Sequence, residues 1–178
     1  MKKQAILITV AGTDRPGMVS ALAGVVSAHG GNWLESRMAN LSGQFAGILR
    51  VEVDETRQPA LLEALQAMES SSYHVTLLPV DESDGVPAGH DVELTLLGQD
   101  HPGIVRDITR LLAQSGVSVQ AFDSHLEDAS MAGGVLFHAH ALLRVPEHMS
   151  TEELHGQLHG LSDSLMVDIQ LADREQAG

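Results

Sequence analysis

Apolar residues follow two different spacings that alternate along the chain. Residues 5–11 form an unbroken apolar run with several β-branched side chains, which predicts a buried strand. Val19, Leu22 and Val26 then recur at the spacing of one helical face, and the two glycines at 30–31 predict the end of that helix. Residues 45–53 alternate apolar and polar positions, as in a strand with one buried face. The pattern therefore predicts a mixture of strands and helices.

The same order of elements, strand-helix-strand-strand-helix-strand, occurs twice. Strands are predicted at residues 5–11, 32–41, 45–53 and 73–80, and again at 91–97, 117–126, 133–145 and 165–171. Helices are predicted between residues 17 and 30, at 60–68, at 102–115, and after a capping box at 150–153. This order predicts an α+β protein of two ferredoxin-like βαββαβ domains, each a four-stranded antiparallel sheet with two helices on one face. The predicted boundaries are 1–81 for the first domain, 82–90 for an acidic linker, 91–173 for the second domain and 174–178 for a tail.

A motif after the first strand of each domain is repeated. Residues 12–19, GTDRPGMV, return 86 positions later at residues 98–105 as GQDHPGIV. A repeat at a fixed period indicates two copies of one structural unit. Each copy joins a strand to a helix through Asp-X-Pro-Gly, and Pro16 is expected in the first helical turn.

This repeated turn offers the chemistry of an anion site. The first backbone N–H groups of a helix lack intrahelical partners and carry partial positive charge, so a carboxylate or phosphate can bind there. Gly17 and Gly103 have no Cβ, which permits the close approach of a ligand. Asp14 and Asp100 either hold the ammonium group of a zwitterionic ligand or cap the helices themselves. The residues alone leave both interpretations open.

The element order, together with the motif Gly-X-Asp-X-Pro-Gly-hydrophobic-Val, resembles a tandem pair of ACT domains, which are small regulatory modules that bind amino acids. The two-repeat layout without an attached enzyme is similar to the group of glycine cleavage system transcriptional repressors, and the resemblance covers residues 3–171. It implies an amino-acid-responsive regulator, not an enzyme, with glycine as the first candidate ligand. It also implies action through a protein partner, such as a DNA-binding transcription activator, without direct contact with DNA. The alternative is a regulatory subunit or a non-sensing interaction module that controls a separate metabolic enzyme.

The resemblance further implies ligand-binding residues in the two turns and early in the second strand of each domain. These positions are Thr13, Asp14, Arg15, Pro16, Gly17, Met18 and Asn32 in the first domain, and Gln99, Asp100, His101, Pro102, Gly103, Ile104 and Ser118 in the second. Asn32 matches the polar position of the family better than Ser118 does, so the turn at Asp14 with Asn32 is favoured if one site alone is competent. Met18 and Ile104 are expected to border the ligand and to limit the size of its side chain.

Composition narrows the range of partners. The formal net charge of −14 over 178 residues disfavours direct contact with nucleic acid or anionic membranes. With no cysteine, the chain forms no disulfide or thiolate metal site. The apolar run near the N-terminus is too short for a secretion signal or a membrane span, which predicts a cytoplasmic protein. Exposed strand edges would be protected by pairing between the two repeats or by pairing between chains. Pairing between chains would make a homo-oligomer.

Ten histidines suggest a metal as a rival hypothesis. His155 and His159 have the i, i+4 spacing of two zinc ligands, but no His-Glu-x-x-His pattern and no assignable third ligand accompany them. His138 and His140 share one side of a predicted strand, with His125 across from them, and a polar sheet face or an interface explains all three without a metal. No pattern for a catalytic nucleophile or a phosphate-binding loop is present, so we assign no catalytic residue, cofactor or metal ligand from the sequence.

Overall fold

The computed structural model describes residues 2–70, 73–79, 88–129 and 134–174. They fall into two compact units, Met1–Gly85 and Val86–Gly178, which we call unit 1 and unit 2. Parts of the predicted linker (82–87), second hairpin (130–133) and tail (175–178) lie outside the described residues.

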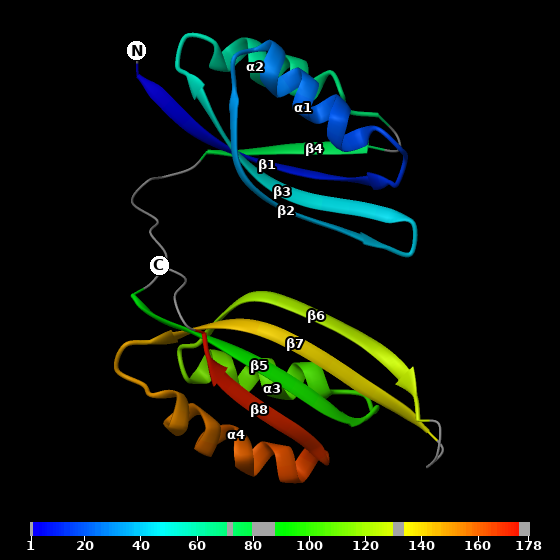
Figure 1. Cartoon of the computed structure of the whole chain (residues 1–178), viewed down its shortest axis with the longest axis vertical. Coiled ribbons are helices and arrows are strands. Elements are labelled where there is room, and N and C mark those ends of the chain that lie inside the picture. Colours follow the sequence, from blue (N-terminus) through cyan, green and yellow to red (C-terminus); the bar gives the residue numbers. More distant parts are fainter. Residues whose placement is uncertain (1, 71–72, 80–87, 130–133, 175–178) are drawn as a thin grey trace. The chain divides into compact units, whose positions relative to one another are not determined.

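Unit 1 is a four-stranded antiparallel sheet with two helices on one face (Figure 1). The strand order across the sheet is β2-β3-β1-β4, so the first and last strands of the unit are neighbours. Its elements are β1 (Lys3–Thr13), α1 (Met18–Ala28), β2 (Asn32–Leu41), β3 (Gln44–Asp54), α2 (Gln58–Gln66) and β4 (Tyr73–Pro79).

Unit 2 repeats this architecture with the strand order β6-β7-β5-β8. Its elements are β5 (Gly89–Gln99), α3 (Ile104–Gln114), β6 (Ser118–Asp128), β7 (Val135–Pro146), α4 (Thr151–Leu165) and β8 (Val167–Asp173). Every strand pair in it is antiparallel. The prediction of an α+β protein with two ferredoxin-like βαββαβ units is therefore confirmed.

Each unit has its own hydrophobic core between the sheet and the two helices. In unit 1, Ile8 and Val51 of the central strands are buried with Leu22 of α1 and Leu61 of α2. Because side chains alternate across a strand, the remaining residues of β1 and β3 lie on the sheet face that carries no helix. No described helix of unit 1 covers that face of the sheet (Figure 1).

The helices that follow the repeated turns begin later than the sequence suggested. Gly17 and Gly103 are the N-cap residues of α1 and α3, with φ angles of 92° and 106°. Pro16 therefore precedes α1, and the prediction that it lies in the first helical turn is wrong. Glycine has no Cβ, so it adopts the left-handed conformation that sets the direction of the helix at this corner.

The apolar spacing of α3 predicts that Val105, Ile108 and Leu112 face inward, and the structure confirms the last two but not the first. Val105 was expected to point inward but is 41% exposed, whereas Ile104 is only 2% exposed. Ile104, Ile108 and Leu112 are spaced four residues apart and form a continuous stripe that faces the sheet.

The last strand also begins later than predicted. Leu165 continues the alternating pattern of the strand, but it is the final residue of α4, and Met166 turns the chain with a φ of 54°. The strand starts at Val167. Alternation alone could not reveal this, because a buried residue in the last helical turn has the same polarity as a buried strand residue.

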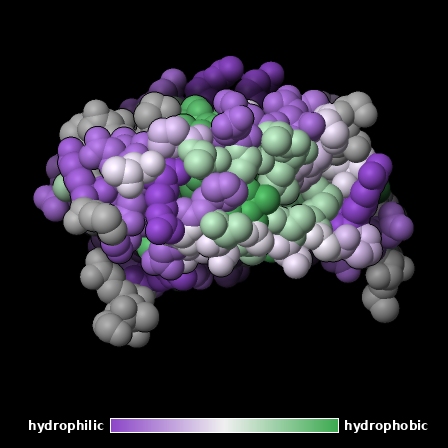
Figure 2. All heavy atoms as spheres, turned by 90° about the horizontal axis from the view of Figure 1, so that it is seen from above, coloured by the Kyte–Doolittle hydropathy of each residue, from purple (hydrophilic) through white to green (hydrophobic). Residues whose placement is uncertain are grey.

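The outer surface of α1 is unusually free of charge. The helix contains no acidic or basic residue, and its exposed positions include Val19, Ala21, Ala23 and Gly24. Figure 2 looks onto the helical side of unit 1, where weakly hydrophobic side chains gather across the middle of the face.

Among the described residues, no helix has the length and apolar character needed to cross a bilayer.

Candidate functional site

The turn between β1 and α1 forms an exposed corner at one end of the unit 1 sheet. The backbone N–H of Asp14 donates to the carbonyl oxygen of Gly43 at 2.9 Å, which ties the turn to the β2–β3 hairpin. No side chain caps the first turn of α1. The alternative in which Asp14 caps this helix is therefore wrong, and the helix end keeps the partial positive charge that attracts an anion.

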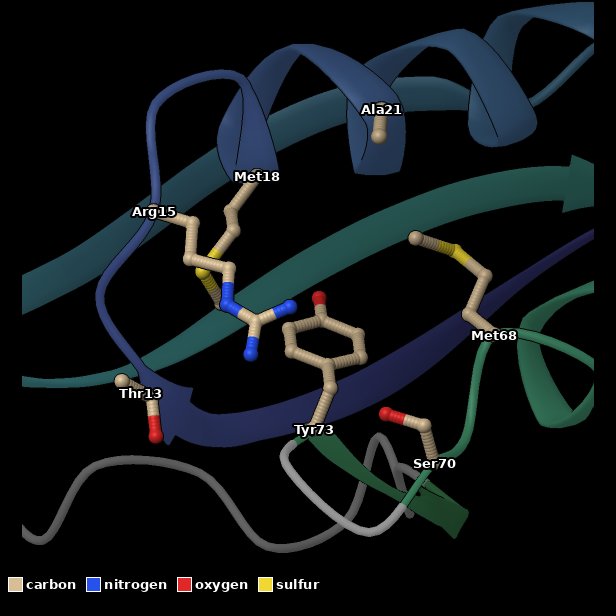
Figure 3. A pocket seen from close by; sticks show the side chains of 7 residues that line it. All are labelled: Thr13, Arg15, Met18, Ala21, Met68, Ser70 and Tyr73. Atoms are coloured by element: carbon tan, nitrogen blue, oxygen red, sulfur yellow. The ribbon is translucent and has the colours of Figure 1, made fainter.

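Beside this turn lies a pocket of about 190 Å³ (Figure 3). Its walls come from the end of β1, the turn, the first residues of α1, and the segment that leads from α2 into β4. The lining residues are Thr13, Arg15, Met18, Ala21, Met68, Ser70 and Tyr73. Of the residues predicted in the first turn, the pocket thus collects Thr13, Arg15 and Met18, while Asp14 is exposed outside it.

The pocket combines an apolar wall with two polar groups that lack partners. Met18, Ala21 and Met68 supply the apolar wall, and Figure 3 shows the side chains of Arg15 and Tyr73 directed into the same space. Within the described part of the chain, Arg15 makes no ion pair or hydrogen bond. A guanidinium without a protein partner, next to a helix N-terminus, is suited to hold a carboxylate.

The hydroxyl of Tyr73 is the second unpartnered group. Its Oη atom is inaccessible to solvent, and no hydrogen-bond partner for it exists among the described residues. Burial also raises the pKa of Tyr73 above its usual value of 10.0, so the hydroxyl remains neutral at ordinary pH. A buried polar atom without a partner is uncommon in folded proteins, and a polar atom in the pocket could satisfy this one only after the side chains around it shift.

At the equivalent corner of unit 2, a side chain of the turn contacts the end of the second helix of the unit. The backbone N–H of Asp100 donates to the carbonyl oxygen of Val135 at 2.8 Å, as Asp14 does to Gly43. However, His101, which replaces Arg15, places Nε2 3.1 Å from the carbonyl oxygen of Leu165 at the end of α4. The imidazole thereby connects the turn to the end of α4.

Two further differences remove the pocket chemistry from unit 2. In the strand registers, Gly12 lies opposite Tyr73, and Gly98 lies opposite Val167, so valine takes the place of the tyrosine. Ile104, which was expected to border a ligand, belongs to the hydrophobic core instead. In addition, Arg106 pairs with Asp107 in the first turn of α3 at 2.8 Å. The second turn therefore has the same N-cap glycine conformation as the first but different side chains around it.

The two residues predicted early in the second strands do not lie at these corners. Asn32 is opposite Glu52, which is in turn opposite Ala5, near the start of β1. Eight residues of extended strand separate Ala5 from Thr13, a distance of about 26 Å. Ser118 is displaced in the same way, because it aligns through Arg144 with Asp91 at the start of β5. Within a single unit, therefore, neither residue can share a small ligand with the turn, and the combination of Asp14 with Asn32 stays a prediction.

Comparison with known proteins identifies the first unit. Residues 4–72 match the family model of the ACT domain. Unit 1 is therefore similar to the ACT domain over most of its length. With unit 2, which has the same topology, the chain has a tandem ACT-like fold.

Two solved structures have this fold over nearly the whole chain. An unknown protein from Galdieria sulphuraria is 27% identical over 97% of this chain and 99% of its own, with a TM-score of 0.82. A protein named "putative glycine cleavage system transcriptional repressor" is 20% identical over 98% of this chain and 99% of its own, with a TM-score of 0.73. No curated protein matches the sequence.

Sequence reasoning missed the far wall of the unit 1 pocket. Met68, Ser70 and Tyr73 follow the turn by more than 50 positions and share no motif with it. The predicted antiparallel pairing of the first and last strands could have placed Tyr73 beside Gly12, because a ferredoxin-like unit brings those strand ends together. Tyr73 is also the one tyrosine in the sequence, in a chain with only 3% aromatic residues.

Proposed function

We propose that the chain is an amino-acid-responsive regulatory protein, and that the pocket of unit 1 is its sensing site. The observation that carries the proposal is the pairing of a guanidinium without a partner and a buried hydroxyl without a partner in one small pocket at the ACT turn. Unit 2 has the same fold without these groups. It is therefore assigned a structural role in this response.

The pocket suits a small zwitterion. The ligand carboxylate would bind the Arg15 guanidinium near the N-terminus of α1, where two positive features coincide. The Tyr73 hydroxyl can accept a hydrogen bond from the ligand ammonium group. Met18 and Met68 form an apolar wall that limits the side chain to a small uncharged group, so glycine, alanine and serine are the first ligands to test.

Regulation would act through a protein partner and without contact with DNA. The net charge of −14 opposes binding to phosphate groups, which requires a basic face. The solved structure named as a repressor of the glycine cleavage system has the same tandem fold, which supports transcription as the regulated process. A pull-down from native lysate with and without glycine would test this part: a DNA-binding protein should be captured in a glycine-dependent manner, while capture of a metabolic enzyme would favour the alternative of a regulatory subunit.

Isothermal titration calorimetry and thermal unfolding against the twenty amino acids would test the sensing site. Binding to the native state must raise the unfolding temperature, by an amount that grows with the logarithm of ligand concentration once the dissociation constant is exceeded. N-acetylglycine and glycine methyl ester, which lack the ammonium and the carboxylate charge respectively, should bind more weakly than glycine. Arg15→Gln should weaken binding, because it removes the cation and keeps a polar side chain of similar length.

The matched control is His101→Gln in unit 2. It changes the equivalent position of the unit 2 corner, so ligand binding should remain as in the wild type. If no amino acid at millimolar concentration shifts the unfolding temperature, the sensing role is wrong. Equal loss of binding in both variants would mean that the ligand does not bind at the unit 1 pocket.

A further inference from the structure

The helix-free face of the unit 2 sheet carries a cluster of imidazole and carboxylate groups. His125 of β6 lies directly opposite His138 of β7 in the strand register. Their rings stack with centroids 4.9 Å apart and an angle of 11° between the planes. Glu127 follows His125 by two residues and so lies on the same face. In the part of the chain that the structure describes, these are the three histidine or acidic residues whose ligand atoms all lie within 4.8 Å of one another.

One nitrogen in this cluster has no hydrogen-bond partner. The Nε2 atom of His138 is inaccessible to solvent and makes no hydrogen bond to any described residue. It lies 3.1 Å from the Oε2 atom of Glu127, and the two groups form an ion pair when the imidazole is protonated. A proton on the imidazole or a metal ion between the two groups would each satisfy this arrangement.

The fold does not require histidines at these positions, as unit 1 demonstrates. Gly12 pairs with Phe45 as Gly98 pairs with Phe137, which aligns the sheets of the two units residue by residue. On this alignment, the positions of His125, His138 and Glu127 are occupied in unit 1 by Ala39, Ala46 and Leu41. The same sheet is therefore built in unit 1 without any metal-ligating side chain at the three positions.

We propose that His125, His138 and Glu127 form a binding site for a divalent transition metal of the zinc class. Two imidazole nitrogens and one carboxylate oxygen are a common ligand set for Zn²⁺, with metal–ligand distances of about 2.0–2.2 Å. Since His125 and Glu127 are exposed, small side-chain rotations can bring their ligand atoms to these distances. A set of three protein ligands on an open surface leaves a coordination position for water or for a group from a partner.

The choice of metal follows from the donors. Imidazole nitrogen suits Zn²⁺, Ni²⁺ and Cu²⁺, whereas Mg²⁺ and Ca²⁺ prefer sites made of oxygen atoms. The site lies on the sheet face of unit 2 and shares no residue with the unit 1 pocket, so the proposal does not depend on amino-acid sensing.

Calorimetric titration of tag-free, chelator-treated protein with ZnCl₂ tests this site. The wild type should bind Zn²⁺ at this site with a stoichiometry of about one, and it should not bind MgCl₂. The double variant His125→Ala/His138→Ala should bind at least about tenfold more weakly, since it loses both nitrogen ligands. Alanine is the unit 1 residue at both positions, so the variant is expected to fold, and its thermal unfolding in metal-free buffer would verify this.

The matched control is His155→Ala/His159→Ala on α4, where two imidazole rings also stack, with centroids 6.4 Å apart. This variant should bind Zn²⁺ as the wild type does. In ¹⁵N NMR spectra of the histidine side chains, Zn²⁺ should shift the ring nitrogens of His125 and His138. The proposal is overturned if the wild type binds no Zn²⁺, if the His125/His138 variant retains wild-type affinity, or if the α4 variant alone loses binding.

Discussion

The substitution Tyr73→Phe should stabilise the free protein and weaken ligand binding at the same time. The Oη atom of Tyr73 is shielded from solvent and lacks a hydrogen-bond partner among the described residues. A buried polar group left unsatisfied costs about 1–3 kcal/mol, and phenylalanine removes the hydroxyl while keeping the ring. Since the ring itself is only half-buried, we take the lower end and expect the free energy of unfolding to rise by about 1 kcal/mol.

The effect on binding should have the opposite sign. A hydrogen bond between the hydroxyl and the ligand contributes about 0.5–1.5 kcal/mol, so its loss should weaken amino-acid binding by about two- to tenfold. Urea denaturation of ligand-free protein would measure the first effect, and calorimetric titration with glycine the second. Because most interior substitutions lower stability, a gain in stability together with a loss of affinity is specific to an unsatisfied group that awaits a ligand.

The same variant makes a prediction about pH. Burial raises the pKa of Tyr73 in the folded state above its usual value of 10.0. The folded state therefore favours the neutral hydroxyl over the phenolate. The free energy of unfolding that depends on this preference is fully present below pH 10 and is lost as the pH rises through the folded-state pKa. The wild type should lose this stability at alkaline pH, and Tyr73→Phe should not. If Tyr73→Phe lowers the stability of the free protein and leaves affinity unchanged, the hydroxyl is satisfied within the protein and our reasoning about the pocket fails.

Three further predictions concern the turns and caps. Ser150→Ala removes the capping box with Glu153 at the start of α4 and should lower the free energy of unfolding of unit 2 by about 1 kcal/mol, measured by urea denaturation. Gly17→Ala meets no neighbouring atom within 4 Å but forces alanine to a φ of 92°, so it should destabilise unit 1 by about 1 kcal/mol in the same assay. Arg106 donates a hydrogen bond to Asp107 and lowers the pKa of that carboxyl. The pair therefore stabilises the fold at pH values above the usual carboxyl pKa, and this contribution is lost as the pH falls through the folded-state pKa of Asp107. Asp107→Asn should therefore show a weaker acid dependence of its thermal unfolding than the wild type does.

The order of the elements could be predicted because each local pattern had one physical meaning. An unbroken apolar run with β-branched residues is buried in a sheet, and apolar residues at helical spacing face a core. The repeated glycine motif fixed the correspondence between the two units. The errors occurred at boundaries where two patterns fit the same residues. Leu165 fits either a helix end or a strand start, and Val105 neighbours the residue that is buried.

The pocket could not be predicted in the same way, because it is made by residues that have no pattern in common. Arg15 and Tyr73 meet through the pairing of β1 with β4, which the sequence implies only through the fold. At the second corner, one imidazole reaches the carbonyl oxygen of Leu165 from 64 positions away. The same Asp-X-Pro-Gly motif is therefore surrounded by different side chains in the two units.

The two units together separate what the fold needs from what a site needs. Unit 2 forms its sheet with Val167 at the position of Tyr73, and unit 1 forms its sheet with Ala46 at the position of His138. Neither the tyrosine nor the histidine is thus required to build a ferredoxin-like unit, and each brings a buried polar atom that lacks a hydrogen-bond partner among the described residues. A side chain that the fold can do without, and that leaves a polar atom unsatisfied, is explained by a ligand that satisfies it. The proposed ligand of unit 1 is accordingly an organic zwitterion, because its neighbours are a guanidinium and apolar side chains. The proposed ligand of unit 2 is a metal cation, because its neighbours are an imidazole and a carboxylate.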